Sequence, residues 1–143
     1  MVIEINMKLP SLNDYIKVCR ANYYYANQYK ARIEQEIGLF LTKMPRMTKP
    51  IKIHFHWVES TKKRDYDNVA FAKKFILDSM QRYGKLENDN RKYVKGFTDT
   101  FEYGKETKVI IEIEEVNNEW WSINNTNYMY NTNINSINRE VLW

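Results

Sequence analysis

Apolar and polar residues alternate most clearly in two stretches of the chain, residues 51–59 and 108–115. In the first stretch the apolar residues Ile51, Ile53, Phe55 and Trp57 alternate with the polar residues Lys52, His54 and His56. An alternation of period two is typical of a half-buried strand, so both stretches are predicted strands. Weaker alternation predicts two further strands, over 2–7 and 92–98.

Helical spacing of apolar residues occurs in two stretches that separate the strands. Residues 22–42 place four apolar side chains three or four positions apart: Ile33, Ile37, Phe40 and Leu41. Residues 68–83 carry a stripe of Val69, Ala72, Ile76, Met80 and Tyr83, widened by Ala70, Phe71, Phe75 and Leu77. A helix that is apolar around most of its circumference is expected to be largely buried. Phe71 and Phe75, which lie off the main stripe, are candidates for a subunit interface.

The elements follow one another in the order β-α-β-α-β-β, which predicts a small single-domain α/β fold with a mixed sheet and two main helices. Gly104 and Lys105 predict a turn that joins the last two strands as a hairpin. A length of 143 residues suffices for one domain with a hydrophobic core. Composition changes after Val116, because residues 117–143 hold nine Asn and only three charged residues. We therefore expect a domain over 1–116 and a flexible, Asn-rich tail over 117–143.

Charge is modestly basic, with a formal net charge of +4, and its distribution is uneven. Between Lys17 and Lys49 seven Lys and Arg residues face only two acids, and four tyrosines lie among them: Tyr23, Tyr24, Tyr25 and Tyr29. Cations interleaved with aromatic residues suit a surface that contacts a polyanion such as DNA. The same pattern is also compatible with a solvated helix face on which the tyrosine rings are packed.

Cellular location follows from three features of the chain. Cys19 is the single cysteine, which excludes an intramolecular disulfide and fits a reducing cytosol. The first residues lack the pattern of a signal peptide, and no apolar run reaches the ~20 residues that span a bilayer. We expect a cytoplasmic protein with no membrane partner.

Candidate chemistry concentrates in residues 62–90. Lys62, Lys63 and Arg64 precede two carboxylates, Asp65 and Asp67, whose spacing places them on the same face of an extended segment. Like charges held this close repel unless a cation lies between them. Mg²⁺ takes oxygen ligands from one or two carboxylates, so these acids are a candidate metal site, with Asp89 joining them by folding. The alternative is that Asp67 or Asn68 is only the N-cap of the following helix.

Lys74 lies two turns after Asp67 on the predicted helix, and helix side chains lean toward the N-terminus. It could neutralise charge on a scissile phosphate, or it could form a surface pair with Asp78. His54 and His56 share one face of their strand. Because no further His or Cys ligands accompany them, we interpret them as polar strand residues or phosphate neighbours rather than as a metal site.

Four segments together resemble the RusA family of crossover-junction endodeoxyribonucleases. They are L-P-S-L-N-D-Y (9–15), R-D-Y-D-N (64–68), K-K-F-I-L-D-S-M (73–80) and G-K-L-E-N-D-N (84–90). The resemblance covers about residues 1–116 and implies a homodimer that cuts four-way (Holliday) DNA junctions with Mg²⁺ or Mn²⁺ by paired symmetric nicks, in recombination and repair. It also makes a phage or prophage origin a reasonable expectation. The alternatives are a non-catalytic protein that binds branched DNA, and a nuclease for other branched DNA such as flaps.

The resemblance implies that Asp65, Asp67 and Asp89 bind the metal and that Lys74 is the active-site lysine, with Lys73 as the fallback. The interval from Asp67 to Asp78 is about one turn longer than in the best-known member, and Asn88 stands where that member has the first of two acids. The residues expected to contact DNA are Arg20, Lys30, Lys62, Lys63, Arg64, Asn68 and Lys73.

Overall fold

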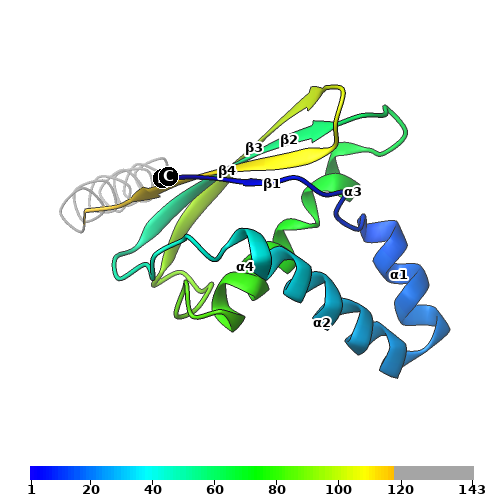
Figure 1. Cartoon of the computed structure of the whole chain (residues 1–143), viewed down its shortest axis with the longest axis horizontal. Coiled ribbons are helices and arrows are strands. Elements are labelled where there is room, and N and C mark those ends of the chain that lie inside the picture. Colours follow the sequence, from blue (N-terminus) through cyan, green and yellow to red (C-terminus); the bar gives the residue numbers. More distant parts are fainter. Residues whose placement is uncertain (118–143) are drawn as a thin grey trace, which may run out of the picture.

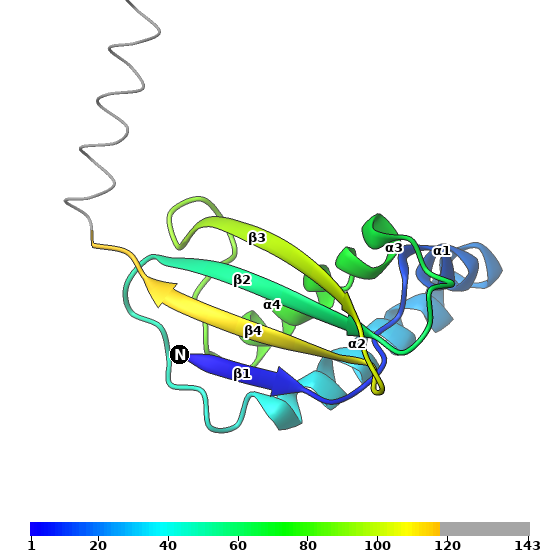
Figure 2. The same ribbon diagram turned by 90° about the horizontal axis from the view of Figure 1, so that it is seen from above.

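The computed structural model describes residues 1–117, and the predicted tail over 117–143 therefore lies almost wholly outside the described residues. A four-stranded sheet contains β1 (Val2–Ile5), β2 (Ile51–Glu59), β3 (Val94–Tyr103) and β4 (Lys108–Glu115), in the order β1-β4-β2-β3. The helices are α1 (Leu12–Ala21), α2 (Tyr23–Phe40), α3 (Tyr66–Ala70) and α4 (Lys73–Arg82). The helices lie on one side of the sheet, and the opposite face is open (Figures 1 and 2). The predicted small α/β fold with a mixed sheet is confirmed.

Strand pairing differs from the prediction at one point. β3 and β4 do not form a hairpin, because β2 lies between them and pairs with both, parallel to β3 and antiparallel to β4. The connection after β3 crosses the end of β2, where the amide of Gly104 donates to the carbonyl oxygen of Glu59 at 2.9 Å. Gly104 and Lys105 indicated that the chain turns at this point, but they did not determine which strands pair with each other. The need of the buried strand β2 for a hydrogen-bonding partner on each edge decided the pairing.

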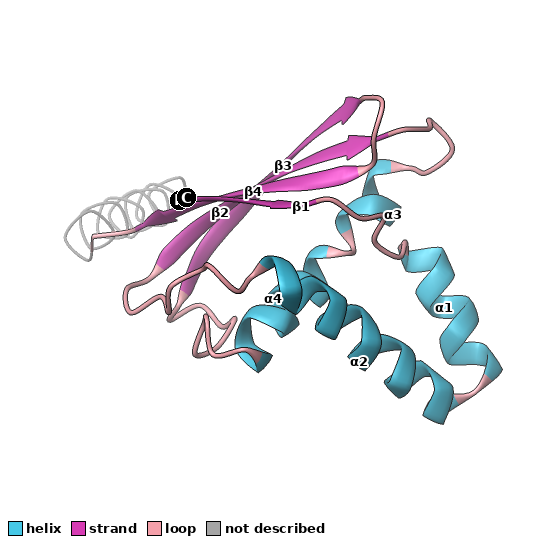
Figure 3. Ribbon diagram, viewed as in Figure 1, coloured by secondary structure: helices cyan, strands magenta, loops and turns pink. Residues whose placement is uncertain are grey.

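The hydrophobic core lies between the sheet and helices α2 and α4 (Figure 3). The alternating apolar residues of β2 face the helices as predicted, and Ile51, Ile53, Phe55 and Trp57 are all buried. Helix α2 contributes Ile33 and Ile37, and α4 contributes the residues Phe75, Ile76, Leu77 and Met80. The periodicity of these two segments therefore predicted most of the core, but Phe40 is only half-buried and Tyr83, the last residue of the predicted stripe, is 41% exposed.

Helix α1 was not predicted. Its N-terminus is a capping box, in which the Asp14 amide donates to Ser11 Oγ at 3.2 Å and the Ser11 amide donates to Asp14 Oδ2 at 3.0 Å. The bond from the Ser11 amide, followed in effect by a second bond from Ser11 Oγ to Asp14 Oδ2 at 2.8 Å, holds the pKa of Asp14 below its ordinary value. The Ser-x-x-Asp spacing of Ser11 and Asp14 is the sequence signal for this helix start, and it was overlooked.

The helix predicted over 68–83 is two helices, α3 and α4, separated at Phe71 and Ala72. A straight helix with apolar residues around most of its circumference could not bury all of them against one sheet. The break lets α3 pack beside α1, where Tyr15 stacks on Phe71 with ring centroids 5.8 Å apart. Phe75 is 1% exposed in the core of its own chain, so it is not available for the subunit interface suggested from sequence.

A network of ion pairs connects α2 to α4. Asp78 is at its centre, since Lys30 Nζ lies 2.8 Å from its Oδ2 and Lys74 Nζ lies 2.8 Å from its Oδ1. Arg82 of α4 forms an ion pair with Glu34 of α2, with 3.1 Å between Arg82 Nη1 and Glu34 Oε2. Burial disfavours the charged form of Asp78, but the hydrogen bonds from the two lysines outweigh burial and lower its pKa.

We predict that Asp78→Asn lowers the free energy of unfolding by about 1–2 kcal/mol at pH 7, because two lysines lose their charged acceptor. The folded-state pKa of Asp78 is lowered, so this stabilisation is present above the ordinary value of 3.8 and is lost as pH falls through the folded-state pKa. Chemical unfolding of both proteins between pH 2 and 7 measures the difference. Glu36→Gln, which removes an exposed α2 pair with Arg32, is the control and should change stability little. A difference that persists unchanged at pH 2 would contradict the assignment.

Candidate active site

Asp65 and Asp67 lie at the start of α3, just beyond the C-terminal end of β2. Asp65 occupies the N-cap position but makes no side-chain capping hydrogen bond, and Asp67 is in the first turn. Both are exposed, and among residues 1–117 neither side chain makes a hydrogen bond or an ion pair. The alternative that Asp67 or Asn68 caps the helix is therefore wrong, and the carboxylate oxygens of both aspartates are free to take ligands.

Arg64 fixes the backbone that leads into this pair. Its guanidinium binds both carboxylate oxygens of Glu59 at the end of β2, and its Nη1 donates to the carbonyl oxygen of Leu9 at 2.7 Å. A bidentate guanidinium–carboxylate pair has a defined geometry, so it holds the connection between β2 and α3 in one orientation. Arg64 is thus engaged inside the protein, whereas Lys62 and Lys63 beside it are exposed.

Asp89 lies at the other end of the sheet. It belongs to the loop over 83–93, and this loop leads into β3 next to the start of β2, where the Ile51 amide donates to the carbonyl oxygen of Tyr93 at 2.8 Å (Figure 1). The nine residues of β2 extend over roughly 26 Å between the two ends. Because β2 and β3 are parallel, the chain must return to the first end before β3 begins. An acid that follows β2 and an acid that precedes β3 are therefore separated.

Among residues 1–117 no group of three or more His, Cys, Asp and Glu side chains is arranged to hold a metal ion. The expectation that folding of the chain would bring Asp89 to Asp65 and Asp67 is thus not met within one subunit. The metal-binding roles of the three acids stay predictions.

The two candidate active-site lysines both have partners. Lys74 is 54% exposed along its side chain and donates to Asp78, which is the surface-pair alternative of the sequence analysis. Lys73 pairs with Asp99 of β3, and its ammonium lies over the rings of Phe97 (4.8 Å) and Phe55 (5.7 Å). The break between α3 and α4 also interrupts the continuous helix that placed Lys74 two turns after Asp67. A catalytic role for either lysine stays a prediction.

Sequence reasoning missed Asp99. Its Oδ1 accepts a hydrogen bond from Trp57 Nε1 at 2.8 Å, while its Oδ2 forms an ion pair with the ammonium of Lys73. Asp99 alternates with Phe97 and Phe101 along β3 and therefore shares their face of the strand. A carboxylate that shares one face of a strand with two aromatic residues is expected to be partly buried, and a buried charge needs a partner of opposite charge. The spacing of Phe97, Asp99 and Phe101 could therefore have predicted that Asp99 pairs with a cation of the same chain.

His54 and His56 lie on the open face of the sheet, as expected for polar strand residues. Each Nδ1 lies 2.7 Å from a threonine Oγ1 of β3, that of Thr98 for His54 and that of Thr100 for His56. His56 Nε2 lies 2.9 Å from Glu102. These contacts connect β2 to β3 across the surface and account for both histidines without a metal.

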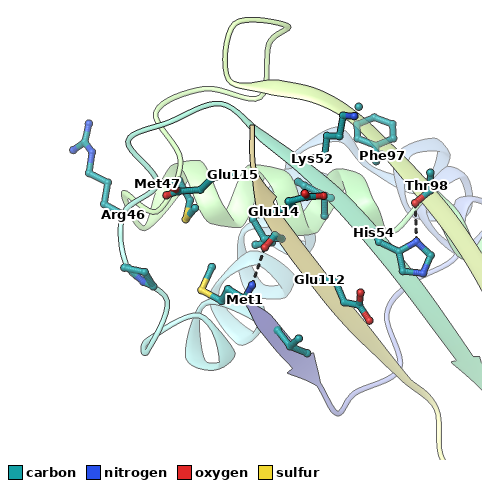
Figure 4. A pocket seen from close by; sticks show the side chains of 15 residues that line it. Met1, Arg46, Met47, Lys52, His54, Phe97, Thr98, Glu112, Glu114 and Glu115 are labelled. Carbon is teal, nitrogen blue, oxygen red and sulfur yellow. Dashed lines mark hydrogen bonds between the residues drawn. The ribbon is translucent and has the colours of Figure 1, made fainter. Parts of the chain in front are cut away.

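A hollow of about 950 Å³ lies on the open face at the end of the sheet that holds the start of β2 (Figure 4). Its lining includes His54, Lys52 and the three acids Glu112, Glu114 and Glu115. The Met1 amino group donates to the carbonyl oxygen of Ile113 at 2.8 Å beside it. This hollow is on the far end of β2 from Asp65 and Asp67, and its carboxylates repel phosphate.

The residues expected to contact DNA divide into two groups. Lys30, Arg64 and Lys73 form ion pairs with carboxylates of the same chain, and Asn68 is half-buried in α3. Arg20, Lys62 and Lys63 are exposed, and among the described residues they have no acidic partner within 4 Å. DNA contact by any of these residues stays a prediction.

The family model described as Endodeoxyribonuclease RusA matches residues 6–114, which is most of the chain and nearly all of the described fold. A search of the curated proteins finds no significant match. No helix within residues 1–117 has the length and apolar character to cross a membrane. The chain belongs to the RusA family of endodeoxyribonucleases, which are nucleases that resolve Holliday junctions.

Proposed function

We propose that this protein is a Mg²⁺-dependent endonuclease, with Mn²⁺ as a substitute, that resolves four-way DNA junctions by paired symmetric nicks during recombination and repair. The observation that carries the proposal is the pair of exposed, unpartnered carboxylates Asp65 and Asp67 in a chain of the RusA family. Acids that served only for capping or for ion pairing would have partners within the chain, as Asp14 and Asp78 do.

The donor set fits the metal, because Mg²⁺ is commonly held by one or two carboxylates together with oxygens of the substrate phosphate. Asp65 and Asp67 would supply these carboxylates. When bound, Mg²⁺ lowers the pKa of a water ligand and stabilises the negative charge that develops at the phosphorus. The exposed Lys62 and Lys63 would bind the phosphates next to the one that is cut and so orient the strand.

Two nicks on opposed strands require two equivalent sites, and a two-fold homodimer provides them. The separation of Asp89 from Asp65 and Asp67 within one chain supports a more specific arrangement. In it, each site combines Asp65 and Asp67 of one subunit with Asp89 of the partner subunit. The dimer is then required for the chemistry itself as well as for the symmetry of the cuts.

We predict that Asp67→Asn still binds a four-way junction but loses at least about 100-fold in cutting rate, because a metal ligand is lost while the phosphate-binding lysines remain. Gel-shift binding in EDTA and cleavage of a synthetic junction with Mg²⁺ measure the two properties. Glu106→Gln, which changes another exposed carboxylate, is the control and should leave both unchanged. Full cutting by Asp67→Asn would exclude Asp67 as a metal ligand.

The same assay on a flap and on a linear duplex separates the alternatives. Metal-dependent, symmetric cuts confined to the junction support the proposal. Cuts in the flap at a comparable rate would indicate a nuclease for branched DNA in general. Binding without any metal-dependent product would indicate a non-catalytic DNA-binding protein.

A mixing experiment tests the arrangement across subunits. Asp67→Asn and Asp89→Asn homodimers are each expected to be inactive. In the mixed dimer, one site would carry both substitutions and the other neither, so mixing should restore nicking of one strand. The measurement is conversion of a supercoiled cruciform plasmid to the open-circular form, rather than to the linear form that paired cuts give. If each site instead took all three acids from one subunit, both sites of the mixed dimer would be damaged and no nicking would return.

A further inference from the structure

Tyr66 separates Asp65 from Asp67 in the sequence and presents an aromatic ring beside them. Its ring stacks on Phe101 of β3 with centroids 4.2 Å apart and an angle of 14° between the planes. Phe101 is half-buried, whereas Tyr66 is 67% exposed. One face of the tyrosine ring therefore rests on a fixed aromatic support while most of its surface is open to solvent.

The position of Tyr66 is not explained by packing of α3. Val69, which is 2% exposed, and the half-buried Phe71 already anchor this short helix to the core and to Tyr15. Tyr15 shows how a packing tyrosine behaves in this chain, because it is half-buried between Phe71 and Phe75. A large aromatic side chain that stays exposed although it is held in one orientation is typical of a contact with a partner.

Charge around the ring favours DNA as that partner. Tyr103, also exposed, lies under the ammonium of Lys62 at 5.4 Å from the ring centroid, and Lys63 is exposed in the same connection. Within residues 1–117 no carboxylate lies within ion-pair distance of Lys62 or Lys63. Exposed aromatic rings flanked by unpaired cations are the usual components of a surface that holds a nucleic-acid strand with unstacked bases.

We propose that Tyr66, supported by Phe101, is a stacking platform for a base next to the phosphate that is cut, in a strand that is unstacked in the complex at the point where it exchanges between the arms of a junction. This inference rests on the proposed function of Asp65 and Asp67 and adds a substrate-positioning residue to it. Stacking recognises the open face of any base, so the platform selects for an unstacked strand and not for a sequence. A ring already fixed by Phe101 loses little conformational freedom on binding.

The test compares Tyr66→Leu with Tyr66→Phe. Leucine keeps an apolar side chain over Phe101 but removes the aromatic face, whereas phenylalanine keeps it. Affinities for a four-way junction and for a linear duplex of equal length are measured in Ca²⁺ or EDTA, so that no cutting is involved. We expect Tyr66→Leu to weaken junction binding about 5- to 100-fold, with duplex binding and the Tyr66→Phe protein close to wild type. Leu39→Ala, which removes a 71% exposed apolar side chain from α2, is the control and should have no effect.

Three results would overturn the proposal: unchanged junction binding by Tyr66→Leu, an equal loss of junction and duplex binding, or an equal loss in Tyr66→Phe. Sedimentation of both variants detects the remaining alternative, in which a second copy of the chain covers the ring and Tyr66→Leu dissociates the dimer. Because these measurements involve no cleavage, their outcome is separate from that of the proposed metal site. If Asp67→Asn retained full cutting while Tyr66→Leu weakened junction binding, only the metal site would be excluded. If Asp67→Asn lost cutting while Tyr66→Leu bound the junction normally, only the stacking platform would be excluded.

Discussion

The parallel pairing of β2 with β3 is the constraint on which the arrangement of this protein depends. β2 is the only described strand that exchanges hydrogen bonds with β3, and on its other edge it pairs with β4. A parallel pair requires a crossover, and α3 and α4 provide it beneath the sheet. The crossover begins with Asp65 and Asp67 at one end of β2 and finishes with Asp89 near the other, so the topology alone separates the acids.

Carboxylates inside the fold determine which cations remain for DNA. Asp78, Glu59 and Asp99 each engage at least one Lys or Arg, and these pairs connect α2 to α4, the end of β2 to the loop before α3, and β3 to α4. A half-buried carboxylate is costly without a partner, so these cations are held by the same interactions that hold the elements together. Lys62 and Lys63 are left exposed beside the two unpartnered aspartates, so both charges at the candidate site are available to a ligand.

The proposals are consistent with one geometry. Asp65, Tyr66 and Asp67 present carboxylate, ring and carboxylate in sequence at the start of a short helix that Arg64 and Val69 fix in place. A metal ion at the acids and a base on the ring would hold a strand at two adjacent points. A partner subunit that contributed Asp89 would link the chemistry to the two-fold symmetry of a four-way junction.

Spacing within single segments was enough to predict the α/β class, the core-facing residues of β2, most of those of α2, the RusA resemblance and the position of Asp65 and Asp67. It also contained two signals that went unused, the Ser11 and Asp14 capping box and the placement of Asp99 between Phe97 and Phe101. Three features could be seen only in the folded chain: β2 separates β3 from β4, the predicted helix breaks at Phe71 and Ala72, and internal acids pair with some of the cations. These outcomes depend on which edges and faces meet across the fold, so Asp89 could be named as a candidate from its motif but could be located only once the direction of β3 was known.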